Sequence, residues 1–408
     1  MKQQHTLQPK LRFPEFDGGW KEFSFKEIFN FSTGKNIKQK EAAPHFETPC
    51  VRYGELYYMY KEVISNIINY TNLDKSELKF SEGDEILLPS AGEDPMDIGS
   101  ASALTLKNVA IGRTINILKP KNKNVYSSIF ASYYINQKLR IKISGLAKGV
   151  SISNVYNTDL QTLFIKLPSL PEQQKIADYL STIDTKINLL EEKKAQLALY
   201  KKAMMQKLFS QEISFKDNNG NDFPEWEEKR LGDLLIHVSK RNKDNVVQKV
   251  LSVSNTKGFI SQEDQFENHR VASMDVTNYK IVKQGEFAYN PSRINIGSIA
   301  LLENFNIGII SPMYVVFKVK DDLNANYFKC LIQLKSFNNN IKKWSSGSVR
   351  ETLNFEDLSL FRYMIPSLPE QQKIADFLSA IDESITKVNE QISQNQSFKK
   401  AMLQQMFV

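Results

Sequence analysis

The stretch Pro168-Ser-Leu-Pro-Glu-Gln-Gln-Lys-Ile-Ala-Asp-Tyr-Leu-Ser-Thr-Ile-Asp184 occurs twice in this chain. It returns 198 positions later as Pro366-Ser-Leu-Pro-Glu-Gln-Gln-Lys-Ile-Ala-Asp-Phe-Leu-Ser-Ala-Ile-Asp382, with changes at two positions. The match continues without a gap to the end of the chain, and weaker matches extend backwards from it. Because the offset is close to half of the 408 residues, the sequence predicts two copies of one architecture.

Each copy is predicted to begin a long helix. Apolar residues recur at steps of four and three, which is the spacing of a narrow coiled-coil seam. No glycine or internal proline interrupts 171–209 or 369–407, so each helix would be about 58 Å long at 1.5 Å per residue. Ser169-x-x-Glu172 and Ser367-x-x-Glu370 have the spacing of capping boxes. The predicted seam residues are Ile176, Leu180, Ile183, Ile187, Leu190 and Leu197 in the first copy and Ile374, Leu378, Ile381, Ile385, Val388 and Ile392 in the second.

A helix of this length with so thin an apolar stripe needs a partner helix, and the repeat supplies one. The short connection 210–225 favours a second helix that starts near the end of the first, which predicts an antiparallel pair. Four polar residues interrupt the stripe, and such residues weaken a coiled coil but can fix its register. They are Lys194, Lys201, Asn395 and Lys399.

The two modules that precede the helices differ in sequence but share landmarks, among them short β-branched stretches and one helical stretch each. The predicted fold class is α+β, with two mixed α/β modules separated by two long helices that pair as an antiparallel coiled coil, related by a pseudo-two-fold internal repeat. The predicted boundaries are an N-terminal segment 1–19, a first module 20–168, a central helix 169–210, a linker 211–225, a second module 226–366 and a C-terminal helix 367–408.

The composition narrows the class of protein. The net charge of +7 and the pI near 9.0 indicate a mild preference for polyanions. Two cysteines cannot form a disulfide framework, and reduced thiols favour a cytoplasmic protein. We find neither an apolar signal core at the start nor an apolar run long enough to span a membrane, so no membrane partner is expected.

Motifs for catalysis are missing. A self-contained DNA methyltransferase would need a glycine-rich cofactor loop, and Asn290-Pro-Ser-Arg293 lacks the second proline and the aromatic residue of an amino-methylating motif. A nucleotide-driven motor would need a phosphate-binding loop, which the sequence lacks. The Glu-x-Lys pattern of some nucleases occurs at Glu191 and Glu227, but this pattern is common by chance. Because the four histidines have no metal-ligand spacing, we assign neither catalytic residues nor a metal site.

Polar and basic clusters occur at matching places in the two divergent modules. A solvated loop is the simpler interpretation of any single cluster, but recurrence in both halves favours a shared ligand. Lys, Arg, Asn and Ser are the side chains that reach phosphates and base edges. The candidate residues are Lys35, Asn36, Lys38, Lys40, Lys148 and Ser151 in the first module and Lys240, Arg241, Lys243, Asn290, Arg293, Ser346, Ser348 and Arg350 in the second.

Two divergent modules, each followed by a long helix that begins with Pro-Ser-Leu-Pro-Glu-Gln-Gln-Lys-Ile-Ala, resemble the specificity subunit of type I restriction-modification systems. The resemblance covers essentially the whole chain. It implies that each module is a target-recognition domain for one half of a bipartite, asymmetric sequence in double-stranded DNA. It also implies that the paired helices set the distance between the half-sites.

The resemblance also implies partners. The helices would dock two methylation subunits, and restriction/translocase subunits would join them. S-adenosylmethionine, ATP and Mg would belong to those partner subunits, so this chain is expected to be a non-catalytic reader that holds no cofactor. A coiled-coil adaptor that binds no DNA remains the alternative outside the enzyme classes.

Overall fold

The computed structural model describes residues 8–149, 151–262, 275–345 and 352–408, and these form two compact units. Unit 1 contains the chain up to Glu191 together with Glu390–Val408, and unit 2 contains Glu192–Asn389. Each unit therefore holds one module and one half of each long helix, α7 (Leu170–Phe209) and α13 (Leu368–Met406). No helix in the described part of the chain is long and apolar enough to cross a membrane.

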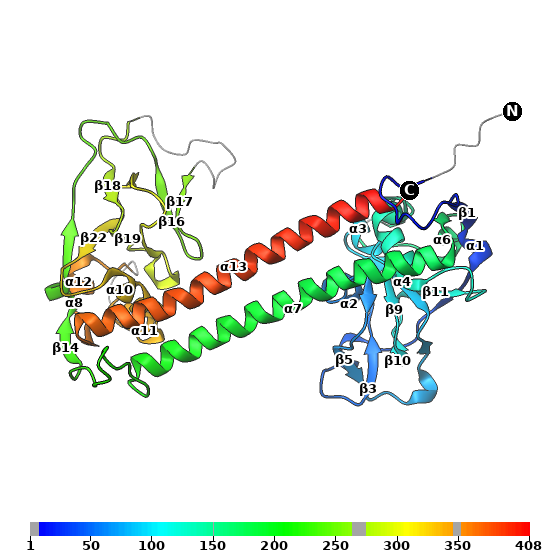
Figure 1. The fold of residues 1–408 in the computed structure, drawn as a ribbon, viewed down its shortest axis with the longest axis horizontal. Coiled ribbons are helices and arrows are strands. Elements are labelled where there is room, and N and C mark those ends of the chain that lie inside the picture. Colours follow the sequence, from blue (N-terminus) through cyan, green and yellow to red (C-terminus); the bar gives the residue numbers. More distant parts are fainter. Residues whose placement is uncertain (1–7, 150, 263–274, 346–351) are drawn as a thin grey trace. The chain divides into compact units, whose positions relative to one another are not determined.

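The module of unit 1, module 1, is built on a five-stranded sheet with the strand order β2-β11-β7-β9-β4. Helix α4 (Ser128–Tyr134) lies beside this sheet (Figure 1). Its aromatic residues Phe130 and Tyr134 share a core with Ile176 and Leu180 of α7. The five strands are β2 (Phe29–Thr33), β11 (Ile115–Pro120), β7 (Glu85–Pro89), β9 (Ser102–Leu104) and β4 (Val63–Ile64).

A second sheet of module 1 has the order β5-β3-β10-β6, and short strand pairs complete the module. The pair β1–β13 brings the start of the module next to the residues that lead into α7, which explains why module and helix are joined without a linker. The strands are β5 (Asn69–Thr71), β3 (Thr48–Val51), β10 (Lys107–Ile111) and β6 (Phe80–Glu82), with the pairs β1 (Lys21–Ser24) and β13 (Phe164–Leu167), and β8 (Ala91–Gly92) and β12 (Ser153–Asn154).

The module of unit 2, module 2, repeats this topology with fewer strands. Its main sheet has the order β15-β22-β19-β20, which corresponds to β2-β11-β7-β9 of module 1. Helix α10 (Ala325–Leu331) takes the place of α4. The strands are β15 (Leu235–Val238), β22 (Val315–Val319), β19 (Phe287–Tyr289) and β20 (Ile299–Leu301), with the pairs β14 (Glu227–Arg230) and β23 (Arg362–Ile365), β16 (Leu251–Ser254) and β17 (Gly258–Ser261), and β18 (Lys280–Lys283) and β21 (Ile307–Ile310). The predicted α+β class with its internal repeat is confirmed.

Helices α7 and α13 run antiparallel in each unit, as predicted. In unit 2, Lys194 of α7 bonds to Asn389 of α13, and Lys201 of α7 bonds to Asp382 of α13. The residue number rises along α7 while that of its partner on α13 falls, which is the pattern of antiparallel helices. In unit 1, the N-terminal half of α7 shares its core with the C-terminal end of α13, including Met406. Of the predicted seam residues, nine are buried, whereas Leu190, Leu197 and Ile385 are half-buried.

A buried glutamine joins each module to its own long helix in the same way. The side chain of Gln173 or Gln371 accepts a hydrogen bond from the N-cap backbone N–H of the module's helix and donates to two backbone carbonyls. The partners are Ser127 N, Val125 O and Pro168 O for Gln173, and Asn324 N, Asp322 O and Pro366 O for Gln371.

The glutamates of the predicted capping boxes have a different role, so that prediction is wrong. The Glu172 carboxylate forms a buried bidentate ion pair with Arg12 of the N-terminal segment. The Glu370 carboxylate accepts a hydrogen bond from Trp226 Nε1. The Ser367 hydroxyl has no hydrogen-bond partner among the described residues. Tertiary contacts use these glutamates because Arg12 of the N-terminal segment and Trp226 at the start of the second module reach the first turn of the helix in their own unit.

Candidate nucleic-acid interface

The predicted basic loop of module 1 leaves one edge of the five-stranded sheet. Strand β2 ends there, β11 begins there and β7 ends there, because Thr33 pairs with Asn116 and Pro89 pairs with Ile115. Three loops therefore emerge side by side. The first carries the predicted residues Lys35, Asn36, Lys38 and Lys40, all of them exposed.

The backbone of this first loop is locked to the loop that precedes β11. The N–H of Lys35 donates to the carbonyl of Ile111 at 2.9 Å, and the N–H of Arg113 donates to the carbonyl of Asn36 at 2.9 Å. Asn36 and Ile37 both have positive φ, at 49° and 57°, a conformation that costs energy for residues with a Cβ. The surrounding hydrogen bonds hold this strained turn, so the side chains of the loop are presented from a fixed backbone.

The second predicted cluster of module 1 reaches the same edge through a hairpin. Lys148 pairs with Asn154 in a β-bridge, and the following Val155 donates its N–H to the carbonyl of Ser90, directly after β7. The Lys148 side chain, however, forms an ion pair with Asp159 at 2.7 Å, which reduces its availability for a phosphate. Ser151 is exposed and no contact distinguishes it.

Module 2 places its first predicted cluster at the corresponding edge. Val238 ends β15 opposite Val316 of β22, so Lys240, Arg241 and Lys243 leave the sheet where Lys35 does in module 1. The carbonyl of Lys240 accepts a hydrogen bond from Ile281, and Arg241 Nη1 donates to Asn278 Oδ1 at 3.2 Å. All three predicted side chains are exposed.

The loop with Asn290 and Arg293 follows β19 and emerges at this edge as well. Asn290 shapes the loop, since its Oδ1 accepts the N–H of Ser292 and its carbonyl accepts the N–H of Arg293. Arg293 is exposed, which leaves its guanidinium accessible to a ligand. Leu353 donates its N–H to the Pro291 carbonyl, as Val155 does to Ser90 in module 1. The predicted residues Ser346, Ser348 and Arg350 lie outside the described residues.

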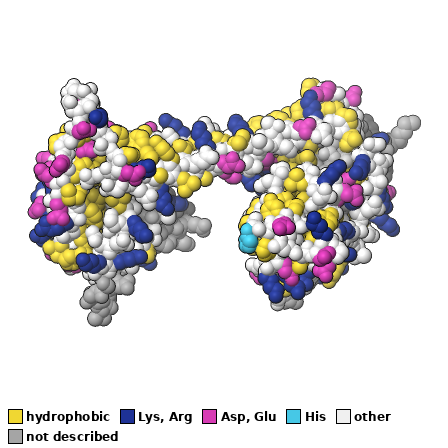
Figure 2. All heavy atoms as spheres, turned by 90° about the horizontal axis from the view of Figure 1, so that it is seen from below, with side chains coloured by type: hydrophobic (Ala, Val, Ile, Leu, Met, Phe, Trp, Pro, Cys, Tyr) yellow, Lys and Arg dark blue, Asp and Glu magenta, His cyan; other side chains and the backbone are white. Residues whose placement is uncertain are grey.

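Each edge brings cationic side chains close to one another. Burial is the larger cause that lowers the pKa of Lys79, and the neighbouring Lys35 and Lys119 lower it further, whereas Glu85 opposes them. In module 2, burial and then the nearby Arg241 lower the pKa of Lys280. On the face drawn in Figure 2, Lys and Arg side chains are interspersed with Asp and Glu side chains, and no continuous basic surface is visible there.

Arg113, Lys79 and Lys280 belong to these edges but were missed from sequence. Arg113 is the first residue of the β-branched stretch Arg113–Leu118, and β11 itself begins at Ile115. Its place at the start of that stretch was the available signal, because the first residues of a strand lie near a sheet edge. Lys79 and Lys280 each stand beside or within a short strand, and nothing in their sequence context sets them apart. Among the described residues, no group of three or more His, Cys, Asp or Glu side chains is arranged to hold a metal ion.

Comparisons with known proteins agree with the repeat. The profile of the type I restriction modification DNA specificity domain matches residues 17–199 and 224–395. The chain is 26% identical to the type I restriction enzyme MjaVIII specificity subunit of Methanocaldococcus jannaschii over an alignment of 370 residues. This alignment covers 85% of this chain and 82% of the relative. The chain is 21% identical over 420 residues to the EcoKI specificity subunit of Escherichia coli K12, covering 95% and 88%.

A solved structure shares the fold. The S subunit of a type I restriction-modification system from M. genitalium aligns with a TM-score of 0.64 at 16% identity, over 98% of this chain and 99% of that chain. The family profile covers both modules and most of both helices, in the order and with the repeat that the structure has. The chain therefore belongs to the family of type I restriction-modification specificity subunits.

Proposed function

We propose that this chain is the DNA-sequence reader of a type I restriction-modification complex, in which each module recognises one half of a bipartite, asymmetric target. The observation that carries the proposal is the shared sheet edge. Two modules of one topology present basic and amide side chains from the same loops, yet those loops differ in sequence. Two modules with different loop sequences are expected to recognise two different half-sites. Two identical modules related by a two-fold axis would instead recognise a palindrome.

The partners follow from the same proposal. Two methylation subunits would dock on the repeated helices, and restriction/translocase subunits would join that core in the cytoplasm. Those subunits would hold S-adenosylmethionine, ATP and Mg, and this chain would position the DNA without catalysing a reaction. The outer surfaces of α7 and α13 support a docking role, because Leu199, Tyr200 and Phe398 expose apolar side chains there.

Mapping adenine methylation across a genome that carries this chain with its methylation subunits tests the proposal. The expected result is one interrupted motif with two different halves. Exchanging residues 20–160 for the module of another family member should change one half alone. A continuous or palindromic motif, or modification by the purified chain on its own, would contradict the proposal. The absence of salt-dependent DNA binding by the assembled complex would favour the adaptor alternative.

A further inference from the structure

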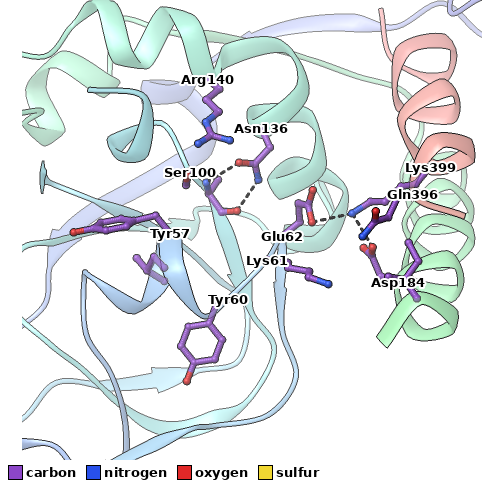
Figure 3. A pocket seen from close by; sticks show the side chains of 13 residues that line it. Tyr57, Tyr60, Lys61, Glu62, Ser100, Asn136, Arg140, Asp184, Gln396 and Lys399 are labelled. Atoms are coloured by element: carbon purple, nitrogen blue, oxygen red, sulfur yellow. Dashed lines mark hydrogen bonds and ion pairs between the residues drawn. The ribbon is translucent and has the colours of Figure 1, made fainter. Parts of the chain in front are cut away.

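Module 1 has an ionic link to the long helix of the other repeat copy. Glu62 lies directly before β4, and its Oε2 is 3.0 Å from Lys399 Nζ of α13. Lys399 also lies 2.7 Å from Asp184 Oδ1 of α7, and Tyr133 of α4 donates its hydroxyl to Asp184 Oδ2 at 2.5 Å. One lysine therefore connects module 1 with both long helices, as Figure 3 shows for Glu62, Asp184 and Lys399.

The link is largely removed from water. The side chain of Lys399 is 12% exposed and that of Glu62 is 19% exposed. Burial alone lowers the pKa of Lys399, but the carboxylates of Glu62 and Asp184 raise it above the ordinary lysine value. The ammonium is thus held in its charged form, and loss of either carboxylate weakens a partly desolvated interaction.

The backbone that carries Glu62 is fixed to the rest of module 1. The Glu62 carbonyl accepts hydrogen bonds from Ser132 Oγ at 2.7 Å and from Ala103 N at 2.8 Å. A cavity of about 300 Å³ lies beside the ionic cluster, lined by Tyr57, Asn136 and other residues of module 1 and both helices (Figure 3). Close packing is therefore incomplete here, and the ionic contacts connect rigid module backbone to α13.

The described residues of module 2 do not form a corresponding link. Lys201 is the repeat counterpart of Lys399, and its ion-pair partner Asp382 is the counterpart of Asp184. Within the described residues, no carboxylate of module 2 joins that pair. Counted from the helix N-caps Ser127 and Asn324, Cys330 occupies the position of Tyr133. Its thiol lies near Lys201 and Asp382, but among the described residues no hydrogen bond joins it to Asp382. The pair in unit 2 therefore connects helix to helix alone.

We infer that Lys399 is a positioning residue, which fixes the orientation of module 1 on the helix pair through Glu62 and thereby restricts the gap between the two half-sites. The inference rests on the proposed function. One added base pair moves a half-site by about 3.4 Å and rotates it by about 34°. The ionic link adds a second attachment of module 1 to α13, besides the ring contacts of Phe407 with Trp20 and Phe130. With both attachments the module resists that displacement more strongly than with the ring contacts alone.

The test uses the complex of this chain with its methylation subunits and duplexes whose gap is native, one base pair longer or one shorter. Glu62→Gln keeps the side-chain shape and removes the charge. We expect methylation of the native duplex to change little, while the ratio of altered-gap to native-gap methylation rises about tenfold. Asp382→Asn is the matched control, because it disrupts the counterpart pair without touching a module, and it should leave that ratio unchanged.

Other variants separate positioning from folding. Lys399→Arg retains the charge and should keep the wild-type gap preference. Glu62→Asp retains both charges with a shorter reach, so it supplies a folded variant with a smaller increase in gap tolerance if Glu62→Gln does not assemble. Wild-type gap preference in both Glu62 variants would overturn the inference. A wild-type complex that methylates no bipartite target would instead overturn the proposed function.

Discussion

Lys399 Nζ lies 2.7 Å from Asp184 Oδ1, and the two residues come from different copies of the repeated helix. The same relationship returns in unit 2, where Lys201 Nζ lies 2.7 Å from Asp382 Oδ2. Each copy thus contributes one aspartate and one lysine to the other. Three of the four polar residues that interrupt the predicted seam, Lys194, Lys201 and Lys399, bond across the helix pair and so define its antiparallel register.

Removal of Lys399 and removal of Lys201 should lower the free energy of unfolding by different amounts. Lys399→Met leaves two carboxylates partly buried without a cation, which we expect to destabilise unit 1 by about 3–5 kcal/mol. Lys201→Met leaves only Asp382, whose side chain is 47% exposed, so the expected cost is below about 1 kcal/mol. Urea unfolding of both variants measures the difference. Equal costs would show that burial of the carboxylates does not decide the stability of these pairs.

The buried glutamines should behave alike in the two units. Replacing either Gln173 or Gln371 by Leu leaves a backbone N–H and two carbonyls with a lost partner, at a cost of about 1–3 kcal/mol in each unit. Gln174→Ala is the control, because Gln174 is exposed and, among the described residues, its side chain bonds to Asp178 of its own helix and to no residue of the module. Thermal unfolding checks the prediction, and a control that is as destabilised as the buried variants would contradict it.

The charge of the Glu370 carboxylate should make the stability of unit 2 depend on pH. Burial raises the pKa of this carboxyl, and the hydrogen bond from Trp226 offsets only part of the rise. A carboxyl with a raised pKa binds its proton more tightly in the folded state, so its contribution to stability falls as pH rises through that pKa. Glu370→Gln should therefore stabilise unit 2 at pH 7. The gain should shrink as pH falls through the raised pKa and be lost below the ordinary carboxyl pKa of about 4.3. Unfolding midpoints across pH 3–8, roughly the range that brackets carboxyl titration, test this.

Glu172 is the matched comparison, since it occupies the same repeat position with a cation beside it. Glu172→Gln removes the charge that pairs with Arg12, whose side chain is 12% exposed, and should destabilise unit 1 at pH 7. Opposite signs for the two glutamate variants are therefore expected. The same sign at both positions would mean that Arg12 and Trp226 do not control how these buried carboxyls affect folding.

The long helices could be predicted closely from sequence because heptad spacing and uninterrupted helix formers act locally. Their observed bounds differ from the predicted ones by two residues at most. The roles of Glu172 and Glu370 could not be predicted from sequence. The same Ser-x-x-Glu spacing occurs whether the glutamate completes a capping box or contacts a residue more than a hundred positions away. The basic clusters were visible, but their meeting at one sheet edge depends on strand order, which no local pattern reveals. Their contact with DNA remains a prediction.

Gly34 offers a test of that edge in module 1 alone. A Cβ at this position would collide with the carbonyl oxygen of Gly112 and lie 2.6 Å from that of Ile111. Because both oxygens belong to the backbone, Gly34→Ala must displace the loop that carries Lys35 and Asn36. We expect weaker recognition of the half-site read by module 1, with the other half unchanged, in methylation assays on duplexes mutated in either half.

Gly145→Ala is the control for this change, since a Cβ there meets no atom within 4 Å. It should leave recognition of both halves at the wild-type level. If Gly34→Ala folds normally and also leaves recognition of both halves at the wild-type level, the loop of Lys35 does not contact the target. The surface of module 1 that recognises DNA must then lie elsewhere on the sheet. If Gly34→Ala instead weakens both halves equally, the defect lies in assembly, and the separate reading of two half-sites loses its support.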